Sequence, residues 1–287
     1  MFAYARPDTL PETFALLNAE PGARLLPGGT DLLVGLRKGT VFAPLVIDLK
    51  RVAELRPGIS ERDGALRIGA GTVLTDVIDD ERVMSRHPAL VAAAHVVGSI
   101  QIRNRATLAG NICNASPAAD TVPPLLVFGA LVELAGSGGD TRLVPLAEFL
   151  VGPGRTALAS GELVTAVELP RPAGAVGSAF QRMTRRRGVD LATVNLACAV
   201  STDGVTRFAF GAVGPRAFVV ADETGILASG TAGSTEEDAV IRRMTDEATP
   251  ISNLRASREY REAMLVVLAR RALRTARERL AGVERGG

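Results

Sequence analysis

Cysteine, histidine and aromatic residues are scarce in this 287-residue chain, which has two cysteines, two histidines, two tyrosines and no tryptophan. Cys113 and Cys198 form no CxxC or Cys-His pair. The chain therefore cannot by itself ligate an iron–sulfur cluster through cysteine or build a structural zinc site. His87 and His95 lack the spacing of a helical metal pair, and we expect both to be packing or surface residues. The sequence predicts no metal site.

Long apolar runs and an excess of one charge are also missing. No stretch approaches the length of a membrane span, and charge and prolines interrupt the first residues, MFAYARPDTLPETF, where a signal peptide has a continuous apolar core. The 33 Lys and Arg residues nearly balance 31 Asp and Glu residues, so nothing indicates a nucleic-acid surface. These absences predict a cytoplasmic protein without a membrane span or a nucleic-acid partner.

The order of strand-like and helix-like segments predicts an α+β protein. Hydrophobic residues make up 47% of the chain, enough for a large core and two domains. Segments rich in Leu, Val or Ile predict strands at 24–27, 45–49, 66–70, 131–136 and 163–169. Periodicity and capping predict helices at 9–19, 31–37, 73–80, 88–97 and 121–130. After a Pro- and Gly-rich boundary at 169–177, strand-like segments occur at 178–184, 193–201 and 205–213. Two predicted helices follow them.

Gly28 and Gly29 follow an apolar strand and directly precede Thr30, Asp31 and a helical run. Residues without a Cβ let backbone N–H groups approach an anion, and a helix N-terminus adds the positive end of its dipole. A tight strand-to-helix turn with Asp31 as the N-cap explains the same residues without a ligand. This segment alone leaves both interpretations open.

A second segment, GSIQIRNRATLAGNICNASPAAD at 98–120, favours a bound ligand. Its Thr107-Leu108-Ala109-Gly110-Asn111 stretch combines small residues with a hydroxyl and an amide, which is poor material for a core. We expect a packed loop that surrounds a phosphate-bearing ligand with backbone N–H groups and these polar side chains. An irregular surface loop is the alternative.

Two other glycine-rich segments do not indicate a Rossmann domain. The segment GAGTVL at 69–74 lacks the third glycine of the dinucleotide fingerprint. GPGRTA at 152–157 has a proline inside the turn and no acidic residue at the end of a second strand. We therefore set both aside.

The two loops, together with most of the chain, resemble the FAD-binding medium subunit of molybdenum hydroxylases, the family of carbon monoxide, xanthine and nicotine dehydrogenases. Residues 27–31, PGGTD, are similar to the family's AGGT/S loop, and residues 107–111, TLAGN, to its TIGGN loop. YARPDTLPETFALL, LAEFLVGPGRTALASGELVTAVELP and SREYREAMLVVLARRAL resemble further family segments in the same order.

The resemblance implies an FAD-binding domain at 1–172, of the vanillyl-alcohol oxidase type, with subdomains at about 1–57 and 58–172. It implies a C-terminal flavoprotein domain at 176–287 with a three-stranded antiparallel sheet and a helical bundle. The implied FAD-binding residues are Pro27, Gly28, Gly29, Thr30, Asp31, Thr107, Leu108, Ala109, Gly110, Asn111, Asp120 and Leu163. For Asp120, a helix N-cap before TVPPLL is a compatible alternative.

The resemblance also implies an electron-transfer role. FAD would take electrons from a small [2Fe-2S] subunit and pass them to an external acceptor, while a large subunit with the molybdenum cofactor carries out the organic chemistry. The expected assembly is a dimer of heterotrimers, and no side chain of this chain is expected to be catalytic. A standalone flavin-dependent oxidoreductase of the same fold, or a flavin-free scaffold subunit, would be the alternatives.

Three departures from the family pattern bear on the site. Ala109 replaces the first glycine of the TIGGN loop, which requires that residue 109 avoid positive φ. Gln181 stands where some members have a lysine near the flavin, and its role stays open. The run Arg185-Arg186-Arg187 faces a partner, the flavin edge or only solvent.

Overall fold

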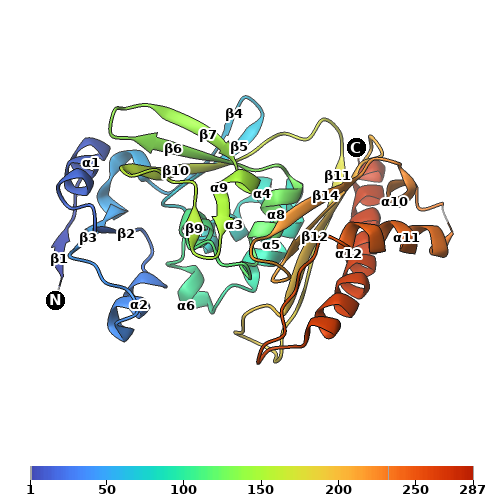
Figure 1. Ribbon diagram of the computed structural model, residues 1–287. Helices are drawn as coiled ribbons and strands as arrows, with labels where there is room; N and C mark the ends of the chain where they lie inside the picture. The colour runs from blue at the N-terminus through green and yellow to red at the C-terminus, as the bar shows by residue number, and fades with distance from the viewer. Residues whose placement is uncertain (1, 232, 287) are drawn as a thin grey trace.

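The computed structural model describes residues 2–231 and 233–286, and its strands form three main sheets and one small hairpin. The sheets follow one another along the chain, so the N-terminal and C-terminal sheets lie at opposite ends of the molecule (Figure 1). Over the described residues, no helix is long and apolar enough to cross a membrane.

The N-terminal sheet is parallel and has the strand order β1-β3-β2. Two helices connect its strands, and Thr9 begins the first of them by accepting a hydrogen bond from the N–H of Glu12. Two short 3₁₀ helices lead from this sheet to the next. The elements are β1 (Ala3–Ala5), α1 (Leu10–Ala19), β2 (Arg24–Leu26), α2 (Leu32–Lys38), β3 (Leu45–Asp48), η1 (Leu49–Arg51) and η2 (Ala53–Leu55).

The second sheet is antiparallel, with the order β4-β5-β10-β6-β7. Its strands are β4 (Ile59–Arg62), β5 (Ala65–Gly69), β6 (Leu131–Gly136), β7 (Thr141–Pro145) and β10 (Glu162–Leu169). Six helices connect β5 to β6: α3 (Leu74–Asp79), α4 (Glu81–Arg86), α5 (Pro88–His95), α6 (Ile100–Arg103), α7 (Leu108–Cys113) and α8 (Val122–Val127). Helix α9 (Leu146–Phe149) and the hairpin β8 (Leu150–Gly152) and β9 (Arg155–Thr156) precede β10. The largest hydrophobic core lies between these helices and the sheet.

The C-terminal sheet is antiparallel and has four strands in sequence order. They are β11 (Val176–Met183), β12 (Val194–Ser201), β13 (Thr206–Gly211) and β14 (Phe218–Asp222). Helices α10 (Ile226–Ser229), α11 (Ser234–Thr245) and α12 (Arg258–Gly286) follow. The prediction of three strands is wrong by one, because a fourth strand, β14, pairs with β13 at the edge of the sheet.

Strand β12 is buried on both faces and joins two parts of the molecule. Leu196 and Cys198 belong to the core that includes α12, whereas the alternate residues Ala197 and Ala199 belong to the core of the second sheet. Helix α12 packs on β11 and β12, while α5 and α8 contact the same sheet. The C-terminal sheet is thus a shared layer between α12 and the helices that follow β5 (Figure 1).

The strong sequence patterns give the right elements. All five predicted strands before the boundary occur, as β2, β3, β5, β6 and β10, and the five predicted helices occur as α1, α2, α3, α5 and α8. The missed elements are shorter or less apolar, such as β1 and α6, and they depend on neighbours that are distant in sequence.

Candidate functional site

The first loop, Pro27 to Asp31, connects β2 to α2 and packs directly on the backbone that precedes the second. A Cβ on Gly28 would lie 2.0 Å from the carbonyl oxygen of Arg105 and 3.2 Å from the Cα of Ala106. Gly29 has a φ of 80°, which a side chain would strain. Both glycines are therefore required by the backbone geometry of this turn.

Asp31 occupies the N-cap position of α2 but makes no side-chain capping hydrogen bond, and its backbone is in the right-handed helical region. Asp31 is thus at the N-cap, as the turn interpretation expects, but its side chain does not cap the helix. In the described residues, the N–H groups of Thr30 and Asp31 donate no hydrogen bond. Successive unpaired N–H groups beside a left-handed glycine are a geometry that can bind an anion.

The second segment is a helix start instead of the expected loop. Thr107 is the N-cap of α7, and its Oγ1 accepts a 2.9 Å hydrogen bond from the N–H of Gly110. Ala109 lies in α7 and has no positive φ, so the position meets the condition under which alanine can replace the family's usual glycine. The small residues from which we expected a loop form a helix instead, because Thr107 caps the helix and Leu108 is fully buried in the core.

Asn111 and Thr121 connect α7 to the segment before α8. The Thr121 hydroxyl donates a 2.7 Å hydrogen bond to Oδ1 of Asn111. The Nδ2 group of Asn111 makes no hydrogen bond in the described part of the chain, so it remains available as a donor.

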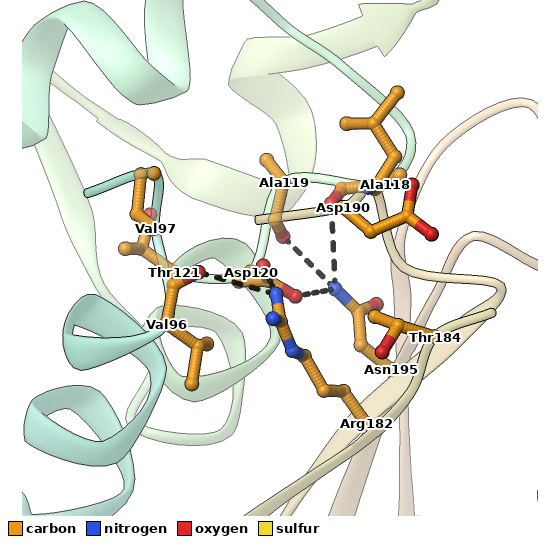
Figure 2. Close-up of polar contacts among 12 residues, drawn as sticks. Val96, Val97, Ala118, Ala119, Asp120, Thr121, Arg182, Thr184, Asp190 and Asn195 are labelled. Atoms are coloured by element: carbon orange, nitrogen blue, oxygen red, sulfur yellow. Dashed lines mark hydrogen bonds and ion pairs between the residues drawn. The ribbon is translucent and has the colours of Figure 1, made fainter. Parts of the chain in front are cut away.

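Asp120 is buried, with 7% of its surface exposed. Its carboxylate accepts hydrogen bonds from Arg182 at 2.7 Å and from Asn195 at 2.8 Å, as Figure 2 shows. Burial raises the pKa of Asp120, although Asn195 and the charge of Arg182 act in the opposite direction. Asp120 is not the N-cap of α8, because Thr121 occupies that position. Leu163 lies farther away in the sequence, in β10, and is fully buried in the core on which α7 packs.

The segment GAGTVL at 69–74, which does not match a Rossmann motif, lies beside both loops. The N–H of Leu108 donates to the carbonyl of Thr72, and the N–H of Leu74 donates to the carbonyl of Ala106. Gly71 and Pro27 line the same small pocket. Sequence reasoning tested this segment only as a Rossmann motif and so missed its place here.

Lys50 also lines the pocket with Pro27 and Gly71, and sequence reasoning missed it as well. Its Nζ lies 2.6 Å from Oδ1 of Asp48, whose Oδ2 accepts a hydrogen bond from the Tyr4 hydroxyl. The hydrogen bonds from Lys50 and Tyr4 hold the pKa of Asp48 below its usual value despite burial. A lysine in the connection that follows a strand was the available signal, because connecting segments positioned by a rigid scaffold often carry binding residues.

The remaining candidate residues lie elsewhere. His87 is buried against the edge of Phe128, whereas His95 is exposed. Burial raises the pKa of Cys113 to about 12, which makes it an unreactive thiol. No group of three or more potential ligands for a metal ion occurs among the described residues.

Two of the three consecutive arginines have local contacts between β11 and β12. Arg185 pairs with Asp190, and Arg186 donates to the carbonyl of Val189, so these two arginines stabilise their own turn. Gln181 is half-buried in β11 opposite Leu196.

Comparison with known protein families decides what this arrangement belongs to. Residues 1–172 match the family model described as the FAD binding domain in molybdopterin dehydrogenase, and residues 178–276 match the CO dehydrogenase flavoprotein C-terminal domain. The chain belongs to the FAD-binding subunits of molybdenum hydroxylases. This FAD-binding subunit therefore has an FAD-binding domain followed by a C-terminal domain, and the family and the cofactor predicted from the sequence are confirmed.

Individual relatives of the FAD-binding subunit match over nearly the whole chain. The xanthine dehydrogenase FAD-binding subunit of Escherichia coli O157:H7 is 32% identical over 276 residues, covering 94% of each chain. The carbon monoxide dehydrogenase medium chain of Hydrogenophaga pseudoflava is 32% identical over 289 aligned residues, covering 98% of each. Quinoline 2-oxidoreductase from Pseudomonas putida 86 has a similar solved structure, with a TM-score of 0.89 at 29% identity and 97% coverage of both chains. These relatives are subunits of oxidoreductases, as the resemblance implied.

Proposed function

We propose that this chain binds FAD between its two loops and passes electrons from a [2Fe-2S] subunit to an external acceptor. One observation carries the proposal: Gly28 packs on the backbone at residues 105–106, which brings the first loop beside the first turn of α7. Such a contact joins two segments that are far apart in sequence and leaves no room for a side chain. It supports a site in which both loops bind one ligand.

The residues present fit the pyrophosphate of FAD. The N–H groups of Thr30, Asp31 and Ala109 donate no hydrogen bond within the described residues, and the Nδ2 group of Asn111 is also available. The Thr107 hydroxyl accepts from Gly110 and keeps its own proton for an anionic oxygen. These donors would meet the negative charge without a lysine from either loop, as the resemblance implied.

The other predicted site residues would shape the FAD site. Pro27 lines the pocket beside the first loop, and Gly29 supplies its left-handed turn. Leu108 and Leu163 are buried, so we propose that they shape the floor of the flavin site. We keep Asp120 as a cofactor-binding residue that acts from its buried position beside α7.

Bound FAD would accept electrons one at a time and release two to an acceptor, which is the chemistry that this chain lacks by itself. The protein would bind the cofactor, orient it and exclude water from it. No side chain is proposed as a general acid or base, because the organic substrate would react at the molybdenum subunit.

We further propose that subdomains at about 1–57 and 58–172 make up an FAD domain of the vanillyl-alcohol oxidase type, followed by the C-terminal domain at 176–287. The N-terminal sheet has its own small core of Leu26, Ala43 and Val46, which supports the first subdomain. The cytoplasm is the location predicted from the sequence.

The proposed partners are a large molybdenum-cofactor subunit and a small [2Fe-2S] subunit, in a dimer of heterotrimers. Exposed apolar side chains flank both loops and support a covered surface here. Leu33 and Val34 on α2 are 47% and 49% exposed, and Ile100 and Ile102 on α6 are 57% and 38% exposed. Large exposed apolar side chains next to a binding site are typical of interaction surfaces.

Co-expression with these two subunits is expected to give a complex that contains two copies of each chain. Native mass spectrometry of the purified complex measures its composition, and flavin absorbance after release from the protein measures FAD per heterotrimer. The medium subunit purified alone is the control. Recovery of this chain as a monomer from all co-expressions would contradict the proposed assembly.

A further inference from the structure

We propose that Arg182 and Asn195 of the C-terminal domain are positioning residues for the FAD site, because they hold Asp120 and, through Thr121, orient Asn111. This inference rests on the proposed function. It gives the C-terminal domain a direct part in cofactor binding, in addition to packing against the FAD-binding domain.

Arg182 and Asn195 are directly opposite each other on the neighbouring strands β11 and β12. Side chains at such positions lie on the same face of a sheet and close together. Nη1 of Arg182 lies 2.7 Å from Oδ2 of Asp120, and Nδ2 of Asn195 lies 2.8 Å from Oδ1. Figure 2 shows both side chains directed toward Asp120. Each oxygen of the buried carboxylate thus has its own donor from the C-terminal domain.

Additional contacts fix the backbone on either side of Asp120. The N–H of Ala212 donates a 2.7 Å hydrogen bond to the carbonyl of Pro117, and Asn195 also donates to the carbonyl of Ala119 at 3.4 Å. Arg182 donates to the carbonyl of Val96 at 3.3 Å, immediately after α5. The C-terminal domain therefore determines where residues 117–121 lie relative to the FAD-binding domain.

Thr121 connects residues 117–121 to the second loop. It is fully buried, and its hydroxyl donates to Oδ1 of Asn111 at 2.7 Å. With its oxygen occupied, the Asn111 amide presents Nδ2 as the available donor. A displacement of residues 120–121 would release this amide and change the donor set of the phosphate site.

Because Arg182 is the charged partner of the buried Asp120, we expect its loss to have the largest effect in the network. Asp120 is 7% exposed, and a buried carboxylate that loses its cation is strongly destabilised. Without Arg182 the carboxylate would turn toward water or take up a proton, and either change would alter the hydrogen bonds that fix residues 117–121. The effect would reach the cofactor through Asn111 without any contact between Arg182 and the cofactor.

Arg216 provides a matched control, because it also extends from the C-terminal domain to the FAD-binding domain. Its Nη1 donates to the carbonyls of Ala147 and Leu150, both at 3.2 Å. These acceptors lie on α9 and β8, and neither belongs to the Asp120 network. Removing Arg216 tests loss of an interdomain arginine without disturbing Asp120.

The experiment compares the variants Arg182→Met, Arg182→Lys and Arg216→Met with the wild-type chain. FAD binding is titrated by flavin fluorescence, the visible circular dichroism of bound FAD is recorded at saturation, and the melting temperature of each FAD-free protein is measured. We expect Arg182→Met to raise the FAD dissociation constant at least about tenfold and to change the flavin dichroism. Arg182→Lys should recover part of the affinity, and Arg216→Met should change the constant by less than about twofold.

Equal dissociation constants and equal flavin dichroism for Arg182→Met and Arg216→Met would overturn the inference, since Arg182 would then only connect the domains. If Arg182→Met does not fold, Arg182→Lys and Arg216→Lys provide the same comparison, and equal results for them would overturn it too. Failure of the wild-type chain to bind FAD would instead contradict the proposed function, so the two failures are distinguishable.

Discussion

Replacing Gly28 with valine is expected to raise the FAD dissociation constant by at least about 100-fold, which corresponds to about 3 kcal/mol of binding free energy. The new Cβ would lie 2.0 Å from the carbonyl oxygen of Arg105, so the first loop must move away from α7. The backbone at Arg105 cannot rotate out of the way as a flexible side chain can. The hydrogen-bond donors of the two loops would therefore no longer face the same ligand. Titration of the purified variant with FAD measures the effect.

Two further variants separate loss of binding from loss of folding. Gly110→Ala places a Cβ 2.9 Å from Oγ1 of Thr107, yet alanine favours the helix in which residue 110 lies. This variant should bind FAD more weakly without a lower melting temperature. Gly136→Ala is the control, because a Cβ there meets nothing within 4 Å. Wild-type affinity in both Gly28→Val and Gly110→Ala would reject the two loops as the FAD site.

Acidification is expected to destabilise the folded chain through His87, by about 2 to 3 kcal/mol between pH 7.5 and pH 4.5. The imidazole is 1% exposed, its Nδ1 has no hydrogen-bond partner among the described residues, and burial lowers its pKa from 6.5 to about 4. At pH 7.5, His87 is mostly neutral in both the folded and the unfolded chain. As the pH falls from there to about 4, only the unfolded chain takes up the proton, so the free energy of unfolding decreases.

The variant His87→Leu should lack this part of the pH dependence, because leucine fills a similar volume and does not titrate. Urea unfolding of the FAD-free protein at both pH values measures the difference, and acidic groups common to both proteins cancel in the comparison. His95→Gln is the control, since His95 is exposed. An equal loss of stability in the wild-type chain and in His87→Leu would show that His87 is not the cause.

Sequence patterns predicted the fold where local information was strong. The segments that became β3, β6 and β10 are apolar and bounded by turn residues, so their strand form did not depend on distant contacts. Strand β14 was missed because it takes its form from pairing with β13. The stretch from Thr107 was expected to be a loop, since its small residues offer little bulk for a core. The capping hydroxyl of Thr107 and the burial of Leu108 stabilise it as a helix instead.

The candidate site was predictable in its motifs but not in its supporting contacts. Gly28 and Gly29 stood out as adjacent glycines before a helical segment. The closeness of Gly28 to Arg105, and the pairing of Asp120 with Arg182, join residues far apart in sequence and carry no local pattern. Lys50 was missed although it follows a predicted strand, and the turn at Gly71 was missed because its segment was considered only as a Rossmann motif.

Anaerobic reduction of the FAD-loaded subunit by the organic substrate of the complex with which it assembles tests the electron-relay role most directly. In the proposed electron relay the molybdenum and iron–sulfur subunits lie between substrate and flavin, and no side chain of this chain is proposed as an acid or base for the organic reaction. Dithionite serves as the positive control for a reducible flavin. We expect the flavin absorbance of the lone subunit to stay unchanged with substrate, to bleach with dithionite, and to bleach with substrate once the other two subunits are added. Rapid bleaching of the lone subunit by that substrate would contradict the relay and favour a standalone flavin-dependent oxidoreductase.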